Sequence, residues 1–173
     1  YAYNFASANM DADANPELIV NEQVSTSFYR LRVIDHDGAE IWARTVSSLS
    51  NPVVADVDKD GAMEIYLPGE NALYDNSGNE IWRARVANHT MFASVADIDA
   101  DGQLDIIEKS VSGLGDIIIR DSLTGQVNYT YLRLAGNQQS VPVYVDLDAD
   151  NQAELLIAGG GNTAVLENTA SRW

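Results

Sequence analysis

Residues 97–105 read Asp-Ile-Asp-Ala-Asp-Gly-Gln-Leu-Asp and lie between two apolar runs. Four carboxylates in nine residues repel one another and raise one another's pKa unless a cation lies among them. Acids at positions 1, 3, 5 and 9 and a main-chain carbonyl at position 7 form a set of hard oxygen ligands. Glycine at position 6 permits the sharp turn that gathers them. This set suits Ca²⁺ better than Mg²⁺, which retains its waters. The stretch therefore predicts a calcium-binding loop.

Three further copies of this stretch begin at residues 9, 56 and 146, so that successive copies are 41–49 residues apart. We expect three strong calcium sites and one weak site from these four loops. The predicted ligands, with position 7 counted for its carbonyl, are Asp56, Asp58, Asp60, Ala62, Glu64, Asp97, Asp99, Asp101, Gln103, Asp105, Asp146, Asp148, Asp150, Gln152, Glu154, Asn9, Asp11, Asp13, Asn15 and Glu17.

The weak site is predicted from departures within the first copy. Asn9 stands at position 1, Ala14 at the turn and Pro16 at position 8, so this loop either binds calcium most weakly or is a structural relic. The fourth copy departs less, because Asn151 replaces the turn glycine and asparagine also adopts the left-handed backbone conformation.

Short apolar runs precede and follow each loop, and turns rich in Asp, Asn, Ser and Gly join two further runs to them. Each repeat thus predicts four short strands, and no stretch has a sustained helical period. Tandem four-stranded units of this length are typical of an all-β fold, the β-propeller, with antiparallel blades. We place the blades at about 1–47, 48–88, 89–137 and 138–173. A β-sandwich is the alternative, although it does not explain the regular loop.

Composition excludes several classes of function. Acidic residues outnumber basic residues 26 to 10 and give a net charge of −16, which opposes binding to nucleic acid or to an anionic membrane surface. The sequence has no cysteine, so disulfides and thiolate metal sites are excluded. No apolar run is long enough for a membrane-spanning helix. The first residue is Tyr1 rather than Met, which predicts a processed or excised product.

Two other interpretations of the motifs are weaker. Residues 97–108 also fit an EF-hand loop, but the twelfth positions of the other copies are apolar and the flanks are strand-like, so Glu108 is predicted to be a strand residue. His36 is predicted at a hairpin tip and His89 in a connecting loop, and no nucleophile–histidine triad is apparent. The three tryptophans fall at matched places and predict packing between blades rather than a sugar-stacking platform: Trp42, Trp82 and Trp173.

The pattern resembles the FG-GAP/VCBS repeats of calcium-binding β-propellers, a family that includes integrin α-subunit heads, propeller lectins and rhamnogalacturonan lyases. The likeness rests on the four acidic loops and on the Gly-x-Glu-Ile-Trp hairpins at 38–42 and 78–82. It implies that each loop joins the first two strands of a blade. Phe-Gly and Gly-Ala-Pro signatures are absent, and four blades are fewer than the six to eight usual for the family.

A ring of four blades is at the lower limit for closure, so the chain either closes alone or forms part of a larger ring. In the second case uncovered blade faces predict self-association or a partner chain that completes the propeller. The first functional hypothesis is an extracellular, non-enzymatic module for adhesion or for binding a glycan or protein. The alternatives are a structural subunit of a fibre or surface assembly, and a segment of a polysaccharide lyase. The ten basic residues are scattered along the sequence, which disfavours the lyase.

Overall fold

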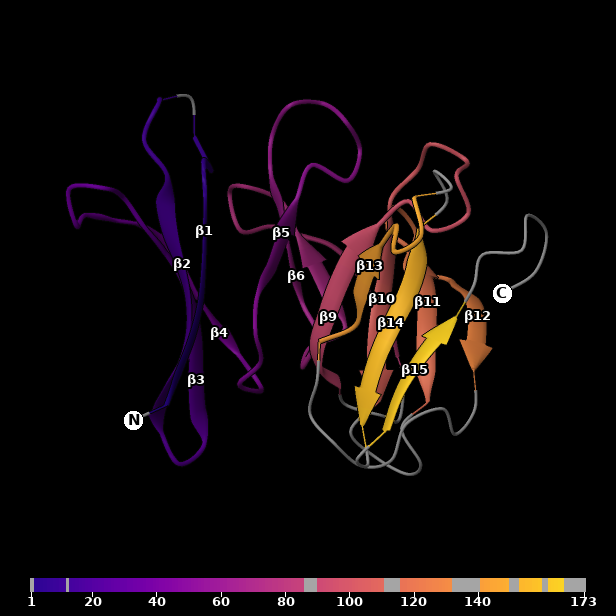
Figure 1. Ribbon diagram of the computed structural model, residues 1–173. Coiled ribbons are helices and arrows are strands. Elements are labelled where there is room, and N and C mark those ends of the chain that lie inside the picture. The colour runs from indigo at the N-terminus through magenta and orange to yellow at the C-terminus, as the bar shows by residue number, and fades with distance from the viewer. Residues whose placement is uncertain are drawn as a thin grey trace. The chain divides into compact units, whose positions relative to one another are not determined.

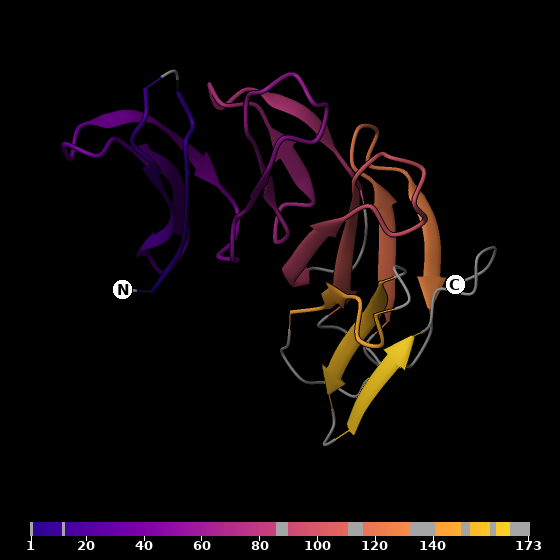
Figure 2. The same ribbon diagram turned by 45° about the horizontal axis from the view of Figure 1, so that its top comes forward.

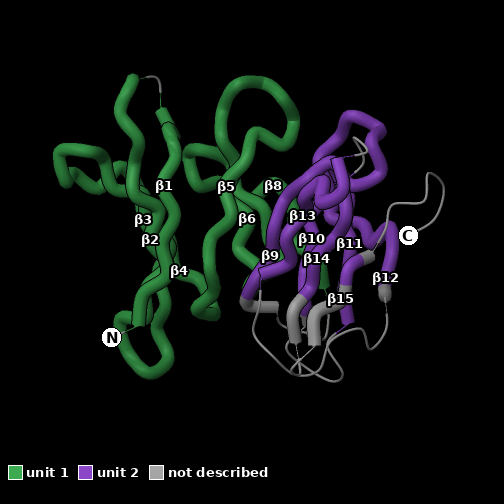
Figure 3. The backbone as a smooth tube through the Cα atoms, viewed as in Figure 1, with its two compact units in different colours: residues 1–86 green, residues 87–173 purple. Residues whose placement is uncertain are grey.

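A computed structural model of the chain contains only β-strands among the residues it describes, which are 2–11, 13–85, 90–110, 116–131, 141–149, 153–159 and 162–166. The strands form four small antiparallel sheets, each built from strands that are consecutive in the sequence (Figure 1). None of the described residues belongs to a helix that could cross a membrane. The chain divides into two compact units, residues 1–86 and 87–173 (Figure 3).

Each unit holds two of the sheets, which Figure 2 shows from a second direction. The strands of the first unit are β1 (Tyr3–Ala8), β2 (Glu17–Ser25), β3 (Phe28–Ile34), β4 (Glu40–Val46), β5 (Val53–Ala55), β6 (Glu64–Leu67), β7 (Ala72–Tyr74) and β8 (Glu80–Arg83). Those of the second are β9 (Thr90–Ala96), β10 (Asp105–Ser110), β11 (Ile117–Asp121), β12 (Val127–Tyr131), β13 (Val143–Val145), β14 (Glu154–Gly159) and β15 (Asn162–Leu166). The sheets are β1–β4, β5–β8, β9–β12 and β13–β15.

In the first unit, a face of the β1–β4 sheet packs against a face of the β5–β8 sheet. Ile19, Leu31 and Val33 of the first sheet share one apolar core with Ile65 and Leu67 of the second. All five side chains are fully buried. Their β-branched and leucine side chains suit a pleated surface that is covered on one side, and their burial is the main favourable contribution to the stability of this unit.

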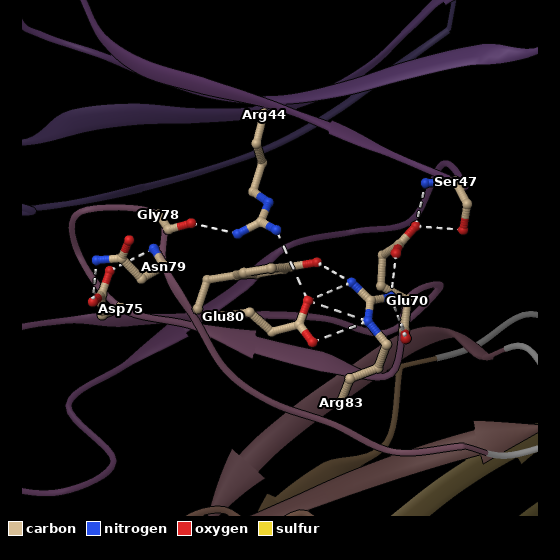
Figure 4. A network of polar contacts seen from close by, with 9 residues as sticks. Arg44, Ser47, Glu70, Asp75, Gly78, Asn79, Glu80 and Arg83 are labelled. Atoms are coloured by element: carbon tan, nitrogen blue, oxygen red, sulfur yellow. Dashed lines mark hydrogen bonds and ion pairs between the residues drawn. The ribbon is translucent and has the colours of Figure 1, made fainter.

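A polar network joins the same two sheets at the edge of this core (Figure 4). Arg44 of β4 donates to the Gly78 carbonyl and lies over the ring of Tyr74 at 4.3 Å. Glu70 accepts hydrogen bonds from Ser47 and from Arg83, which also pairs with Glu80. Charge-assisted bonds to a buried carboxylate are stronger than neutral ones, so this network fixes how the two sheets are placed.

The second unit has its own core and its own buried ion pair. Ile107 and Ile119 of one sheet pack with Leu155 of the other, all without exposed surface. Arg120 Nε lies 2.6 Å from Glu108 Oε2, and both side chains are buried. Glu108 lies in β10, as predicted, so the EF-hand alternative is excluded.

The tryptophans pack in different ways. Trp42 of β4 donates from Nε1 to the Asn76 carbonyl at 2.8 Å and also lies against Gly78. Asn76 and Gly78 belong to the β7–β8 turn of the neighbouring sheet. This confirms the predicted packing between sheets for Trp42. The ring of Trp82 instead contacts Tyr66 of its own sheet at 5.7 Å between centroids. Trp173, like His89, lies outside the described residues.

Candidate metal centre

The four acidic loops join the first and second strands of the four sheets, as the family resemblance implies. In each loop the acid at position 9 is the first residue of the second strand and pairs with the last residue of the first strand. The pairs are Ala8 with Glu17, Ala55 with Glu64, Ala96 with Asp105, and Val145 with Glu154. Each loop therefore closes on a two-stranded ladder.

A second contact recurs inside all four loops. The buried acid at position 9 accepts a hydrogen bond from the backbone N–H at position 2. The bonds run from Met10 to Glu17, from Val57 to Glu64 at 2.8 Å, from Ile98 to Asp105 at 3.3 Å, and from Leu147 to Glu154 at 2.8 Å. In the first three loops the apolar side chain at position 2 is buried as well, so the loop is held from both sides.

In the loop at 56–64, backbone N–H groups hold the aspartates in place. Asp56 Oδ2 accepts from Gly61 at 3.0 Å, Asp58 from Asp60, and Asp60 from Ala62. Oxygens of Asp56, Asp58 and Glu64 lie within 4.8 Å of one another. Asp56 Oδ1 is shielded from solvent and accepts no hydrogen bond from the described residues. A buried carboxylate oxygen without a partner is costly, and a cation is a partner that this oxygen set fits.

The loop at 97–105 repeats this arrangement. Asp97 Oδ2 accepts from Gly102 at 2.9 Å, and the N–H of Asp101 donates to Asp99. Here Asp97, Asp99 and Asp101 form the close group of oxygens, and Asp97 Oδ1 is again buried without a hydrogen bond among the residues described. Two loops thus have the same unpartnered oxygen at position 1.

The acid at position 9 has a raised pKa in two of the loops. Burial raises the pKa of Glu64 to about 7, and the charges of Asp58, Asp60 and Asp56 add to the effect, although the Val57 N–H opposes it. Burial likewise raises the pKa of Asp105 to about 6. A divalent cation among these carboxylates would reverse this repulsion and favour the charged forms.

Backbone strain marks the same loops. Position 4 has positive φ in three of them, at Lys59 (64°), Ala100 (59°) and Ala149 (63°), and position 6 has positive φ at Gly61 (93°) and Gly102 (89°). Glycine adopts these angles at little cost, whereas other residues pay about 1–2 kcal/mol. The sequence predicted the turn at position 6, but the left-handed residue at position 4 gave no glycine signal.

The fourth loop is described in part. Asp146, Asp148 and Glu154 offer oxygens within 4.8 Å of one another. The predicted ligands Asp150 and Gln152 lie outside the described residues, as does Asn151 at the turn.

The polar side chains of the first loop differ from those of the other loops. Position 1 holds an amide side chain in place of a carboxylate, and Asn9 Nδ2 donates a hydrogen bond to the Asp13 carbonyl. Two groups of possible ligands meet here: Asp13, Glu17 and His36, and Asp11, Glu17 and Asp35. The loop motif did not predict His36 and Asp35, which belong to the turn after β3. The β2–β3 register brings them here, because Leu18 pairs with Ile34 and places the two turns side by side.

Comparisons with known proteins bear on the fold. The chain is similar in structure to Bap1, a biofilm matrix protein of V. cholerae. The TM-score is 0.65 at 19% sequence identity, over 82% of this chain and 22% of the Bap1 chain. The likeness shows a shared β-rich fold, and this chain spans about a fifth of the length of that protein. No family model matches the sequence, and no curated protein sequence matches it.

Proposed function

We propose that the chain is a calcium-stabilised β-propeller segment of the FG-GAP/VCBS kind that acts outside the cell as a non-enzymatic binding module. One observation carries the proposal: the same loop frame gathers carboxylates at matched places, with a buried unpartnered oxygen in two copies. Millimolar extracellular calcium fills such loops even when they bind weakly. The description of Bap1 as a biofilm matrix protein supports an extracellular role in adhesion or in a matrix.

A glycan is the ligand that we propose for the surface beside the first loop. A depression of about 500 Å³ is lined by Met10, Asp11, Ile41, Trp42, Asn76 and Ser77. An aromatic and an aliphatic side chain beside amide, hydroxyl and carboxylate groups match the apolar faces and hydroxyls of a sugar. The proposed contact therefore lies on the first unit, between residues 10–11, β4 and the β7–β8 turn.

A glycan array with and without calcium tests this function. We expect glycan binding that Asn76→Ala and Ile41→Ala weaken. Ile81→Ala is the matched control, because Ile81 occupies the equivalent place in the next sheet with similar exposure, 48% against 43% for Ile41. If no glycan binds in calcium, or if Ile81→Ala has the same effect as Ile41→Ala, the glycan part of the proposal is wrong.

The fibre or surface-assembly alternative has an observation of its own. Tyr3 and Phe5 of β1 are 56% and 72% exposed, and Val143 and Val145 of β13 are also exposed. Apolar side chains on the first strands of two sheets are surfaces that a partner chain or a second copy would cover. Electron microscopy in calcium distinguishes the two: filaments that Phe5→Ser abolishes favour assembly, and discrete monomers favour the binding module.

The lyase alternative gains no support from the described arginines. A lyase needs a cluster of free basic groups to stabilise a sugar anion, and five of the described arginines instead face carboxylates or carbonyls. Arg30 pairs with Glu22, Arg32 with Glu40, Arg83 with Glu70 and Glu80, and Arg120 with Glu108, while Arg44 bonds the Gly78 carbonyl.

A further inference from the structure

The first loop differs from the loops at 56–64 and 97–105 in the place of its unpartnered oxygen. In the loops at 56–64 and 97–105 that oxygen belongs to the aspartate at position 1. In the first loop position 1 is Asn9, and the unpartnered oxygen is Oε1 of Glu17 at position 9. Glu17 has no exposed surface, and only its Oε2 is bonded, to the Met10 N–H. The groups close to Glu17 thus decide what this loop can bind.

Those groups include a histidine. His36 stands in the turn between β3 and β4, with its side chain 45% exposed, and its Nδ1 lies 3.5 Å from Asp13 Oδ2 and 2.6 Å from Asp35 Oδ1. Ligand atoms of His36, Asp13 and Glu17 lie within 4.8 Å of one another. Asp35 is anchored separately, because its Oδ1 also accepts the His36 backbone N–H at 2.6 Å. The hydrogen bond to Asp35 raises the pKa of His36.

The distances suit a small ion that takes both nitrogen and oxygen. Ligands 2.0–2.1 Å from a tetrahedral Zn²⁺ are roughly 3.3 Å apart, close to the separation of His36 Nδ1 from Asp13 Oδ2. Calcium instead takes six to eight oxygens, whereas here an imidazole nitrogen lies beside the carboxylates and Asn9 is engaged with the loop backbone. Imidazole with carboxylates is a donor set for zinc and the neighbouring transition metals.

We propose that the first loop is not a weak copy of the calcium sites but a zinc site, whose ligands are His36, Asp13 and the buried Glu17. Binding removes the Nδ1 proton of His36 to solvent and releases its hydrogen bond to Asp35, which stays nearby with Asp11 as a second set of oxygens around Glu17. The site lies wholly within the first unit and does not require the other loops to bind calcium.

Zinc titration of the untagged chain tests the proposal. Calorimetry measures the binding, and the two-bond proton–nitrogen NMR spectrum shows which histidine nitrogen is involved. The sequence has two histidines, so each signal is assignable from one variant. We expect one zinc ion to bind with coordination at Nδ1 of His36. His36→Asn should weaken this binding at least about tenfold, since even supporting partners of metal ligands contribute 10–100-fold, and Glu17→Gln should weaken it too. His89→Asn is the matched control and should leave zinc binding unchanged.

Two results would overturn the zinc site: zinc binding that His36→Asn leaves unchanged, or zinc binding without a shift of the His36 nitrogens. The spectrum of the wild-type chain gives this answer even if a variant folds poorly. Repeating the titration in millimolar calcium separates this proposal from the calcium proposal. A zinc response at His36 with no calcium binding elsewhere supports the zinc site and rejects the calcium proposal. Displacement of zinc by calcium contradicts the zinc site.

Discussion

The loops at 9–17 and 56–64 have the same frame but different contents. Both close on a strand pair and both bury a glutamate that accepts the position 2 N–H. Only the second has a carboxylate at position 1, held by the turn glycine Gly61. In the first, Asn9 bonds the loop backbone and a histidine approaches from a neighbouring turn. The same frame therefore carries two different sets of polar groups: positions 2 and 9 close both loops, whereas position 1 and the approach of His36 differ between them.

Removal of calcium should have the largest effect. An ion that binds only the folded chain stabilises it by about 2.7 kcal/mol per site at 100 times the dissociation constant. For three sites we expect a chelator to lower Tm by about 15 °C or more, and added calcium to restore it. Differential scanning calorimetry measures this. An unchanged Tm in chelator would mean that the loops at 56–64, 97–105 and 146–154, like the first loop, bind no calcium.

Glu17→Ala and Glu64→Ala test the shared frame without metal. Each removes the acceptor of a buried backbone N–H, so each should lower the free energy of unfolding of calcium-free protein by about 1–3 kcal/mol. Urea denaturation measures it. Glu17→Gln and Glu64→Gln are the matched controls, because the amide keeps an acceptor oxygen, and they should cost less. Equal losses for alanine and glutamine would show that the charge, rather than the hydrogen bond, holds the loop.

The features that the sequence predicts are those that depend on residues close together in the chain. The loops and their flanking strands follow from the order of acids, glycines and apolar residues, which act within one hairpin. The approach of His36 to Asp13 joins residues that are far apart in the sequence and depends on the β2–β3 register. Similarly, Arg120 reaches Glu108 only because β10 and β11 pair. Position 4 was missed because Lys59 and Ala100 are not residues that favour a left-handed conformation.

An exchange at position 1 should convert one loop toward the other. Asp56→Asn removes a ligand charge and should weaken one calcium site by about tenfold or more, whereas Asn9→Asp should give the first loop a measurable calcium affinity. Calcium titration of each variant measures the change. Asp75→Asn is a control outside the loops, since Asp75 bonds only its own turn in the contacts described. If Asp56→Asn binds like the wild type, position 1 does not select the ion.

The smallest effects should come from backbone strain, in opposite directions. Gly102→Ala places a side chain at a φ of 89°, where no neighbouring atom clashes, so the cost is conformational and about 1–2 kcal/mol. Ala100→Gly relieves a φ of 59° two residues earlier and should be neutral or stabilise by up to about 1 kcal/mol. Urea denaturation in calcium compares them. Two changes of the same sign would contradict the described loop geometry.

The central claim is that carboxylates at matched places in the loops of successive sheets hold calcium. Isothermal titration calorimetry of the folded, metal-free chain with calcium tests it most directly. The account predicts three calcium ions per chain, with one of the three sites weakened about tenfold or more in each of Asp56→Asn and Asp97→Asn. A folded chain that binds no calcium at millimolar concentration would contradict it.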